Sequence, residues 1–201
     1  MTLYHPRMGR PAKFDSESML DAAADLIAAG GPAQATVTAI AERLGAPSGS
    51  IYHRFESRDL LLAQLWIRTI RRAQAGFLEA LEADEIHRAA QAAALHIPRW
   101  SRAHLAEATV LLLCRREDLA AQWPDELGSS LSHLNDDLAA AMRRFTKRRY
   151  GRITSKDSQT VVFALVDVPY AAVRRYLIAG QPPPPAVDDL VTAACDAALF
   201  A

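Results

Sequence analysis

The sequence predicts an all-α protein with a small N-terminal helical domain and a larger C-terminal helical domain. Apolar residues recur at helical spacing along most of the chain. Half of the residues are apolar, with Ala and Leu prominent beside many Arg and Glu, a composition that favours helices. With 201 residues, the chain is long enough for one large or two small domains with a buried core.

The charge balance leaves the nature of the partner open. The 23 Lys and Arg residues equal the 23 Asp and Glu residues, and a protein that binds DNA needs basic groups on only one face. The two cysteines, Cys114 and Cys195, lie in apolar or Ala-rich runs and are expected to be buried and reduced. The sequence has neither a secretory signal nor an apolar run of about 18 residues, which predicts a cytoplasmic protein without a membrane span.

The segment 36–55 predicts a helix-turn-helix. Thr36 stands at the N-cap of a first short helix, which Gly45 ends, and Pro47 starts a second one. The apolar anchors are Val37, Ile40, Ala41 and Leu44 on one face of the first helix, and only Ile51 and Phe55 on the second. Two short helices joined by a Gly-containing turn, with polar residues exposed on the second, are typical of this motif.

Two further helices flank the motif and set the domain boundaries. The first is capped by Asp15 or Ser16 and runs to about Ala29, where Gly-Gly-Pro ends it. The other is capped by Ser57 and runs to about Leu81, so it starts in the N-terminal domain and ends beyond it. We therefore assign 1–13 to a flexible basic arm, 14–56 to the helix-turn-helix domain, 57–82 to a connector helix and 83–201 to the second domain.

The stretch G-A-P-S-G-S-I-Y-H-R-F, followed by E-S-R-D-L-L, resembles the signature of the tetracycline-repressor (TetR) family of bacterial transcription regulators. The matching positions are Thr36, Ile40, Ala41, Gly45, Gly49, Ser50, Tyr52, His53, Phe55, Arg58 and Leu61. The resemblance covers roughly the first third of the chain, and many family members carry Lys in place of Ser48 and of Arg58. It implies a homodimer that binds a palindromic operator in double-stranded DNA and, most often, a repressor that a small molecule releases.

The candidate DNA contacts lie in and beside this motif. Gly49 lets the backbone come close to the duplex, Tyr52 can donate its hydroxyl to a phosphate, and His53 can reach a base edge or a phosphate. The full set, which adds residues near helix N-termini where backbone N–H groups favour a phosphate, is Thr36, Thr38, Ser48, Gly49, Ser50, Tyr52, His53, Arg54 and Arg58. Two alternatives stay open: Tyr52 as a core aromatic residue, and the two arginines as ordinary solvated charges.

Two other basic clusters have open interpretations. Residues 1–13 contain three basic residues and no acid, and they are either a solvated tail or an arm that reaches along DNA. The second cluster lies around Gly151 and consists of Arg143, Arg144, Lys147, Arg148, Arg149 and Arg152. We favour a cationic helix end that complements the helix dipole over a second nucleic-acid patch.

The second domain is expected to be helical with short breaks. Pro98 should kink or end the Ala-rich helix that contains it. The last two long helices lie on either side of four consecutive prolines, and the resemblance implies that they pack against their copies in a second subunit. The penultimate helix has two apolar stripes, which agrees with this arrangement. One stripe consists of Val161, Leu165, Val168 and Ala172, and the other of Val162, Val166, Val173 and Leu177. One stripe can pack in the subunit's own core and the other against a partner.

Aromatic and polar-tipped residues within these apolar helices predict a small-molecule site. The candidates are His96, Trp100, His104, Trp123, His133, Phe163, Asp167 and Tyr170. Each one alone is better explained by core packing, and only the set as a whole suggests a site. Asp167 is the sharpest candidate, because a carboxylate between Val166 and Val168 must be paired, be neutral or bind something.

The resulting hypothesis is a cytoplasmic, sequence-specific DNA-binding transcriptional regulator, a homodimer whose repression a small effector relieves. We expect neither a cofactor nor catalysis, because the six histidines lack metal-binding spacing and no Gly-rich loop resembles a nucleotide cradle. The alternative is a helical ligand-binding or protein-interaction module that does not bind DNA.

Overall fold

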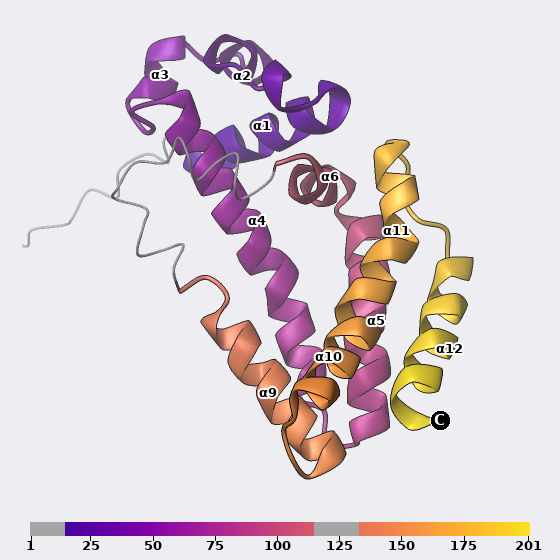
Figure 1. Cartoon of the computed structure of the whole chain (residues 1–201). Coiled ribbons are helices and arrows are strands. Elements are labelled where there is room, and N and C mark those ends of the chain that lie inside the picture. Colours follow the sequence, from indigo (N-terminus) through magenta and orange to yellow (C-terminus); the bar gives the residue numbers. More distant parts are fainter. Residues whose placement is uncertain (1–14, 115–132) are drawn as a thin grey trace, which may run out of the picture.

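The computed structural model describes residues 15–114 and 133–201, and all regular structure within these ranges is helical, which confirms the all-α prediction. The elements are α1 (Ser16–Gly30), the 3-10 turn η1 (Pro32–Gln34), α2 (Val37–Leu44), α3 (Ser48–Tyr52), α4 (Arg58–Leu81), α5 (Ile86–Ala103), α6 (Leu105–Leu113), α9 (Asp136–Tyr150), α10 (Ser155–Val162), the π-turn η3 (Phe163–Asp167), α11 (Val168–Ile178) and α12 (Ala186–Phe200). Helices α1, α2 and α3 gather at one end of the molecule, and α4 runs from there along the second domain (Figure 1). None of the helices described is long and apolar enough to cross a membrane.

The helix boundaries in the N-terminal domain follow the capping residues. Asp15 Oδ1 accepts a hydrogen bond from the Ser18 N–H at 2.8 Å, so Asp15, of the two candidates, is the N-cap of α1. The hydroxyl of Thr36 caps α2, and that of Ser57 caps α4, each accepting from the N–H three residues on. Gly45 has the left-handed conformation, with φ of 61°, that ends α2 and allows the sharp turn into α3.

Two hydrophobic cores lie along α4, which contributes to both. The first core joins α1, α2 and α3 to the N-terminal half of α4, and it also contains Val110 and Cys114 from the α6 region. The second core joins Phe77 and Leu81 of α4 to α5 and to α9–α12. Helix α6 follows the second domain's α5 in the chain but packs on α1, so the core of the N-terminal helical domain also includes a later segment of the chain.

Pro98 does not end its helix, which continues to Ala103. A proline inside a helix lacks one N–H and so loses one backbone hydrogen bond. Ala93, Ala94 and Pro98 are all buried, and α5 packs against α4, α11 and α12. Tertiary packing therefore keeps this helix intact past the proline.

The predicted apolar stripes of the penultimate helix were wrong in their register. The π-turn η3 adds a residue to the helix, with the Val168 N–H donating to the carbonyl of Phe163, five residues earlier. Apart from Ala164, the buried apolar residues of this segment consequently follow a four-residue step, Val161, Leu165, Pro169, Val173 and Leu177, which takes members from both predicted stripes. Pro169 cannot donate to the carbonyl four residues before it, which explains why the helix widens here.

The basic end of α9 binds the ends of neighbouring helices. Arg148 donates to the carbonyls of Leu81, Ala83 and Asp84, where α4 ends. The guanidinium of Arg149 donates to the carbonyl of Leu199 near the C-terminus of α12. Two of the six cations of this cluster therefore bind carbonyls at the ends of other helices, which differs from the predicted complement to the dipole of their own helix.

Candidate DNA-binding surface and effector cavity

The helix-turn-helix presents one short helix whose polar side chains face outward. The Ile51 and Phe55 side chains are almost fully buried and fix α3 and the residues after it on the first core. The exposed residues of the α3 region are Ser48, Gly49, Tyr52, His53 and Arg54, with Ser50 half-buried. This helix lies at the end of the molecule away from the second domain (Figure 1).

Tyr52 and Gly49 are not explained by packing within the described part of the chain. Tyr52 is 56% exposed, so it is not the core aromatic residue that remained an alternative. A Cβ atom built on Gly49 would meet nothing within 4 Å, although Gly in a helix is destabilising by about 0.5–1 kcal/mol relative to Ala. An exposed tyrosine beside a helical glycine in open space leaves room for the close approach of a second molecule.

Arg58 is a structural residue rather than an exposed cation. Its Nε atom donates to the carbonyl of Ala35 at 2.8 Å, and its Nη2 atom donates to that of Pro32. These bonds tie the start of α4 to the η1 turn just before α2. The sequence pattern could not reveal this role, because the partners lie 23 and 26 residues away in the chain.

The described surface of the helix-turn-helix carries little positive charge. Between residues 36 and 58 the Lys and Arg positions are Arg43, Arg54 and Arg58. Arg43 forms an ion pair with Asp25 at 2.8 Å, and Arg58 is held by carbonyls. Hydroxyl and backbone N–H groups of α2 and α3, such as Thr38 and Ser48, must then supply much of any phosphate binding by this surface.

A cavity of about 190 Å³ lies in the second domain between α4, α5, α6 and the η3–α11 helix. Its lining is almost entirely apolar and consists of Ala73, His96, Ile97, Trp100, Ser101, Ala108, Leu111, Val166, Tyr170, Val173 and Leu177. Among the described residues, no Asp, Glu, Lys or Arg lines it. Such a cavity favours an uncharged, largely hydrocarbon occupant, because an unpaired charge would lose its hydration there.

His96 contributes to the wall of this cavity as a neutral imidazole. Its Nε2 atom donates to the carbonyl of Ala73 on α4 at 2.7 Å, which leaves the proton off Nδ1. Burial lowers the pKa of His96 below its ordinary value and outweighs the backbone hydrogen bond that raises it.

The cavity contains three of the eight predicted effector residues: His96, Trp100 and Tyr170. His104 stacks on Trp100 with ring centroids 5.3 Å apart but does not line the cavity, and the exposed His133 binds Asp136 at 2.7 Å. Phe163 is 53% exposed. Trp123 lies outside the described residues.

Asp167 is not the buried carboxylate that the sequence led us to expect. The residue is exposed and lies beside Ser155 and Ser158 in a separate surface hollow, so its charge does not need a buried partner. The π-turn accounts for this, since it alters which residues of the helix face the core. The cavity residues missed from sequence are Ala73, Ile97, Ser101, Ala108, Leu111, Val166, Val173 and Leu177, and nearly all of these residue types are common in any core.

A metal centre has no support in ranges 15–114 and 133–201, where no cluster of three or more His, Cys, Asp and Glu could hold an ion. Cys195 is also chemically inert, because burial raises the pKa of its thiol to about 12.

Comparisons with known proteins point to one family. Residues 19–65 match the family model described as bacterial regulatory proteins, tetR family. No curated protein sequence matches the chain. Among solved structures, the TetR family regulator PfmR from Thermus thermophilus has a TM-score of 0.70 at 17% identity, covering 90% of this chain and 96% of its own. FadR from Bacillus subtilis, solved with stearoyl-CoA, has a TM-score of 0.69 at 16% identity, covering 92% and 98%.

Proposed function

The chain belongs to the tetR family of bacterial regulatory proteins, and from this premise we propose that it is a homodimeric repressor that an uncharged apolar molecule releases from a palindromic operator. The family consists of DNA-binding transcriptional regulators rather than enzymes. The observation that carries the proposal is the pairing of an outward-facing α3 with an apolar cavity in the second domain.

The proposed base-reading residues are on α3 and just after it. His53 and Tyr52 are exposed on the same short helical segment, and Gly49 leaves the backbone accessible. We assign His53 to base reading and Tyr52, Thr38 and Ser48 to phosphates. We do not place Arg58 among the primary contacts, because its Nε and Nη2 atoms donate to backbone carbonyls.

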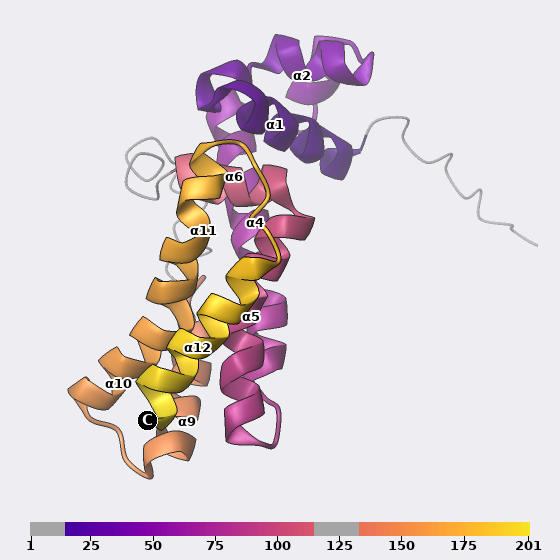
Figure 2. The same cartoon turned by 90° about the vertical axis from the view of Figure 1, so that its right-hand side faces the viewer.

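An exposed apolar face supports a dimer through the C-terminal helices. Large apolar side chains lie exposed along α10, η3, α11 and α12, and they are Val162, Phe163, Tyr170, Ile178 and Leu190. Helices α11 and α12 lie side by side at one side of the molecule (Figure 2). The same apolar face of a second copy can cover these side chains. A dimer with two-fold symmetry would then present two copies of α3 to an inverted repeat in the DNA.

The proposed effector class follows from the cavity. Its lining offers hydrocarbon surface with hydroxyls only from Ser101 and Tyr170 among the described residues. The similar FadR structure contains stearoyl-CoA, a molecule with a long hydrocarbon chain, which agrees with an apolar occupant here. The cavity volume of about 190 Å³ lies below the roughly 300–1,000 Å³ of typical ligand sites. A larger occupant must therefore push the surrounding helices apart.

The DNA-binding proposal can be tested without knowing the operator. We would select the operator from random duplex DNA, then compare its affinity with that of scrambled DNA. His53→Ala should relax preference at one position per half-site by about 1–3 kcal/mol, whereas His133→Ala, at an exposed histidine remote from α3, should leave preference unchanged. Absence of binding to any DNA at low salt would instead favour the helical ligand-binding module.

The effector proposal needs an apolar probe and a blocked cavity. N-phenylnaphthylamine, a neutral dye, should bind the wild-type protein with a rise in fluorescence and lower its operator affinity. Ala108→Leu should reduce dye binding because residue 108 lines the cavity, while Ala139→Leu, at an exposed site on α9, serves as the matched control. If the dye and the operator bind independently of each other, release by an apolar effector is wrong.

A further inference from the structure

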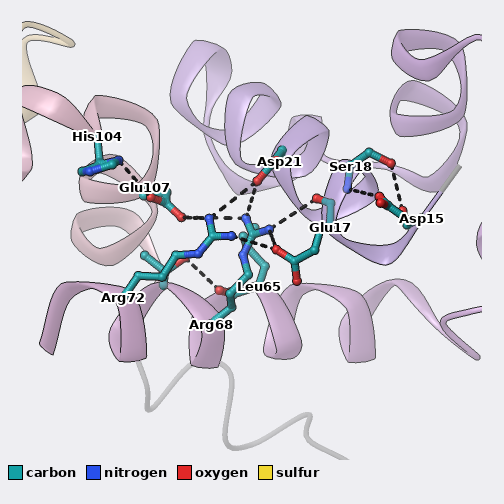
Figure 3. A network of polar contacts seen from close by, with 10 residues as sticks. Asp15, Glu17, Ser18, Asp21, Leu65, Arg68, Arg72, His104 and Glu107 are labelled. Atoms are coloured by element: carbon teal, nitrogen blue, oxygen red, sulfur yellow. Dashed lines mark hydrogen bonds and ion pairs between the residues drawn. The ribbon is translucent and has the colours of Figure 1, made fainter. Parts of the chain in front are cut away.

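A cluster of charged side chains joins three helices at the boundary between the two domains. It contains Glu17 and Asp21 of α1, Arg68 and Arg72 of α4, and Glu107 of α6 (Figure 3). We call these five residues the interdomain clasp. Helix α1 belongs to the DNA-binding domain, while α4 and α6 supply walls of the cavity.

Glu107 is the acceptor at the centre of the clasp. Its Oε1 atom accepts a hydrogen bond from Arg72 Nη1 at 2.8 Å and lies 3.9 Å from Arg68 Nη2. The Glu107 and Arg68 side chains are both only 11% exposed, so their charges interact with little screening by water. His104 Nδ1 also lies 3.5 Å from Glu107 Oε2.

The two arginines hold α1 at the same time. Glu17 Oε2 accepts from Arg68 Nη1 at 3.0 Å and from Arg72 Nη2 at 2.8 Å. Asp21 Oδ1 lies 2.8 Å from Arg68 Nη2. A shift of α6 that moves Glu107 therefore changes the charge balance around the same two guanidinium groups that hold the DNA-binding domain.

Arg68 is incompletely satisfied in this arrangement. Its buried Nε atom makes no hydrogen bond to any described group, whereas its Nη2 atom lies 2.8 Å from the Asp21 carboxylate. A buried donor without a partner is unfavourable, typically by about 1–3 kcal/mol. A displacement of Glu107 from Arg72 towards Arg68 would shorten the 3.9 Å contact with Nη2 at the expense of the hydrogen bond to Arg72.

The clasp residues on α4 and α6 are adjacent to the cavity, whereas those on α1 are not. Arg72 precedes the lining residue Ala73, and Glu107 precedes the lining residue Ala108. Leu111, one turn further along α6, lines the cavity and also packs against the first core. An occupant that separates α4 from α6 must therefore change the distance between Arg72 and Glu107.

We propose that the interdomain clasp holds the DNA-binding domain in its operator-binding orientation, and that Glu107 is the positioning residue through which occupancy of the cavity changes that orientation. This inference rests on the proposed function for its regulatory meaning. The occupant acts only through its different affinity for the two arrangements of the helices. Glu107 contacts neither DNA nor the occupant, and it acts through Arg68 and Arg72.

The test measures domain orientation directly, by pulsed electron–electron spin resonance between labels at Ala33→Cys and Arg88→Cys. Both sites are exposed, one in the DNA-binding domain and one on α5, and the native Cys114 and Cys195 are buried. Doubly labelled protein is diluted with unlabelled protein so that distances within one chain dominate. Glu107→Gln should broaden or shift the distance distribution, because it removes the charge that both arginines share.

A second variant and a matched control keep the result interpretable. Glu17→Gln, at the more exposed end of the clasp, should change the distribution in the same way with little risk to folding. Arg144→Gln breaks the exposed 2.8 Å pair with Glu82 at the other end of α4 and should leave the distribution unchanged. The proposal is overturned if Glu107→Gln superposes on wild type, or if the control shifts equally.

Operator affinity separates this proposal from the proposed function. Glu107→Gln should bind the selected operator about 5- to 10-fold more weakly than wild type, in the range of typical coupling between sites. Wild-type affinity in this variant would overturn the regulatory role of the clasp. If the wild-type protein itself binds no operator, the repressor proposal fails, and the distance measurements still decide whether the clasp sets domain orientation.

Discussion

Gly76 of α4 faces the imidazole of His96 on α5, and a Cβ atom at position 76 would lie 2.6 Å from the His96 Cε1 atom. The glycine thus allows His96 to lie close against α4 and to donate to the carbonyl of Ala73. Because Gly76 has no side chain, it also determines the position of His96 in the wall of the cavity.

Gly76→Ala should destabilise the protein and deform the cavity. The added methyl group forces His96 to move, and overpacking of this kind typically costs about 1–3 kcal/mol, more than the helix gains from losing a glycine. Urea denaturation would measure the stability loss, and N-phenylnaphthylamine titration would detect the altered cavity. An unchanged midpoint together with unchanged dye binding would contradict this account of Gly76.

Gly49→Ala should have the opposite effect on stability. A methyl group there meets no atom, so the helix should gain about 0.5–1 kcal/mol in its free energy of unfolding. Operator affinity should nevertheless fall, because the methyl group occupies space that the DNA backbone needs. Thermal denaturation and a gel shift measure the two effects, and an affinity equal to wild type would show that DNA does not approach this residue.

Arg58→Ala should weaken DNA binding through the fold rather than through a lost phosphate contact. Loss of hydrogen bonds from a charged group to two carbonyls should cost about 1–3 kcal/mol of stability. The slope of log affinity against log salt should then stay near its wild-type value. A slope flatter by about one unit would restore Arg58 as a phosphate contact.

The arm should supply much of the salt-dependent binding, since the described helix-turn-helix surface has few available cations. Replacing Arg7, Arg10 and Lys13 together with Gln should flatten the salt slope by up to about 2.7 units if each contacts a phosphate. Arg143, Lys147 and Lys156, exposed cations of the second domain, provide a control with the same loss of charge. Equal effects of both triple variants would mean that the arm acts only through net charge.

His96 should make the protein less stable in mild acid. Its pKa is lowered in the folded state, so the unfolded chain binds the proton first as the pH falls through about 6.5. Stability is fully present above that value and is lost below it, with a slope of at most about 1.4 kcal/mol per pH unit for one proton. Denaturation between pH 7.5 and 5.5 should show a steeper loss in wild type than in His96→Gln; parallel curves would be inconsistent with a neutral, buried His96.

The helix boundaries of the N-terminal domain could be predicted from the sequence because the residues that set them act locally. A cap such as Thr36 and a left-handed glycine such as Gly45 act within one turn of the chain, and the structure has both where they were expected. Arg58 lacked such a signal, because the carbonyls that hold it are contributed by another segment.

The cavity was only partly predictable for a related reason. His96, Trp100 and Tyr170 were found because aromatic and polar-tipped residues are conspicuous, whereas Ala108 and Leu111 resemble any core residue. The exposure of Asp167 depends on the π-turn, which no residue pattern had indicated. Contacts between distant segments and irregular backbone decide these positions, and neither has a fixed spacing in sequence.

The π-turn makes the length of its segment as important as its composition. Deleting one residue between Phe163 and Asp167 would remove the extra residue, and the helix after it would wind regularly with its present face still towards the core. Inserting one further residue at the same place would instead rotate everything after it by about 100°. Val173 and Leu177 would then leave the core, and exposed side chains such as Ile178 would turn away from the surface they occupy. A deletion and an insertion of one codon in this segment should therefore have opposite consequences for the fold.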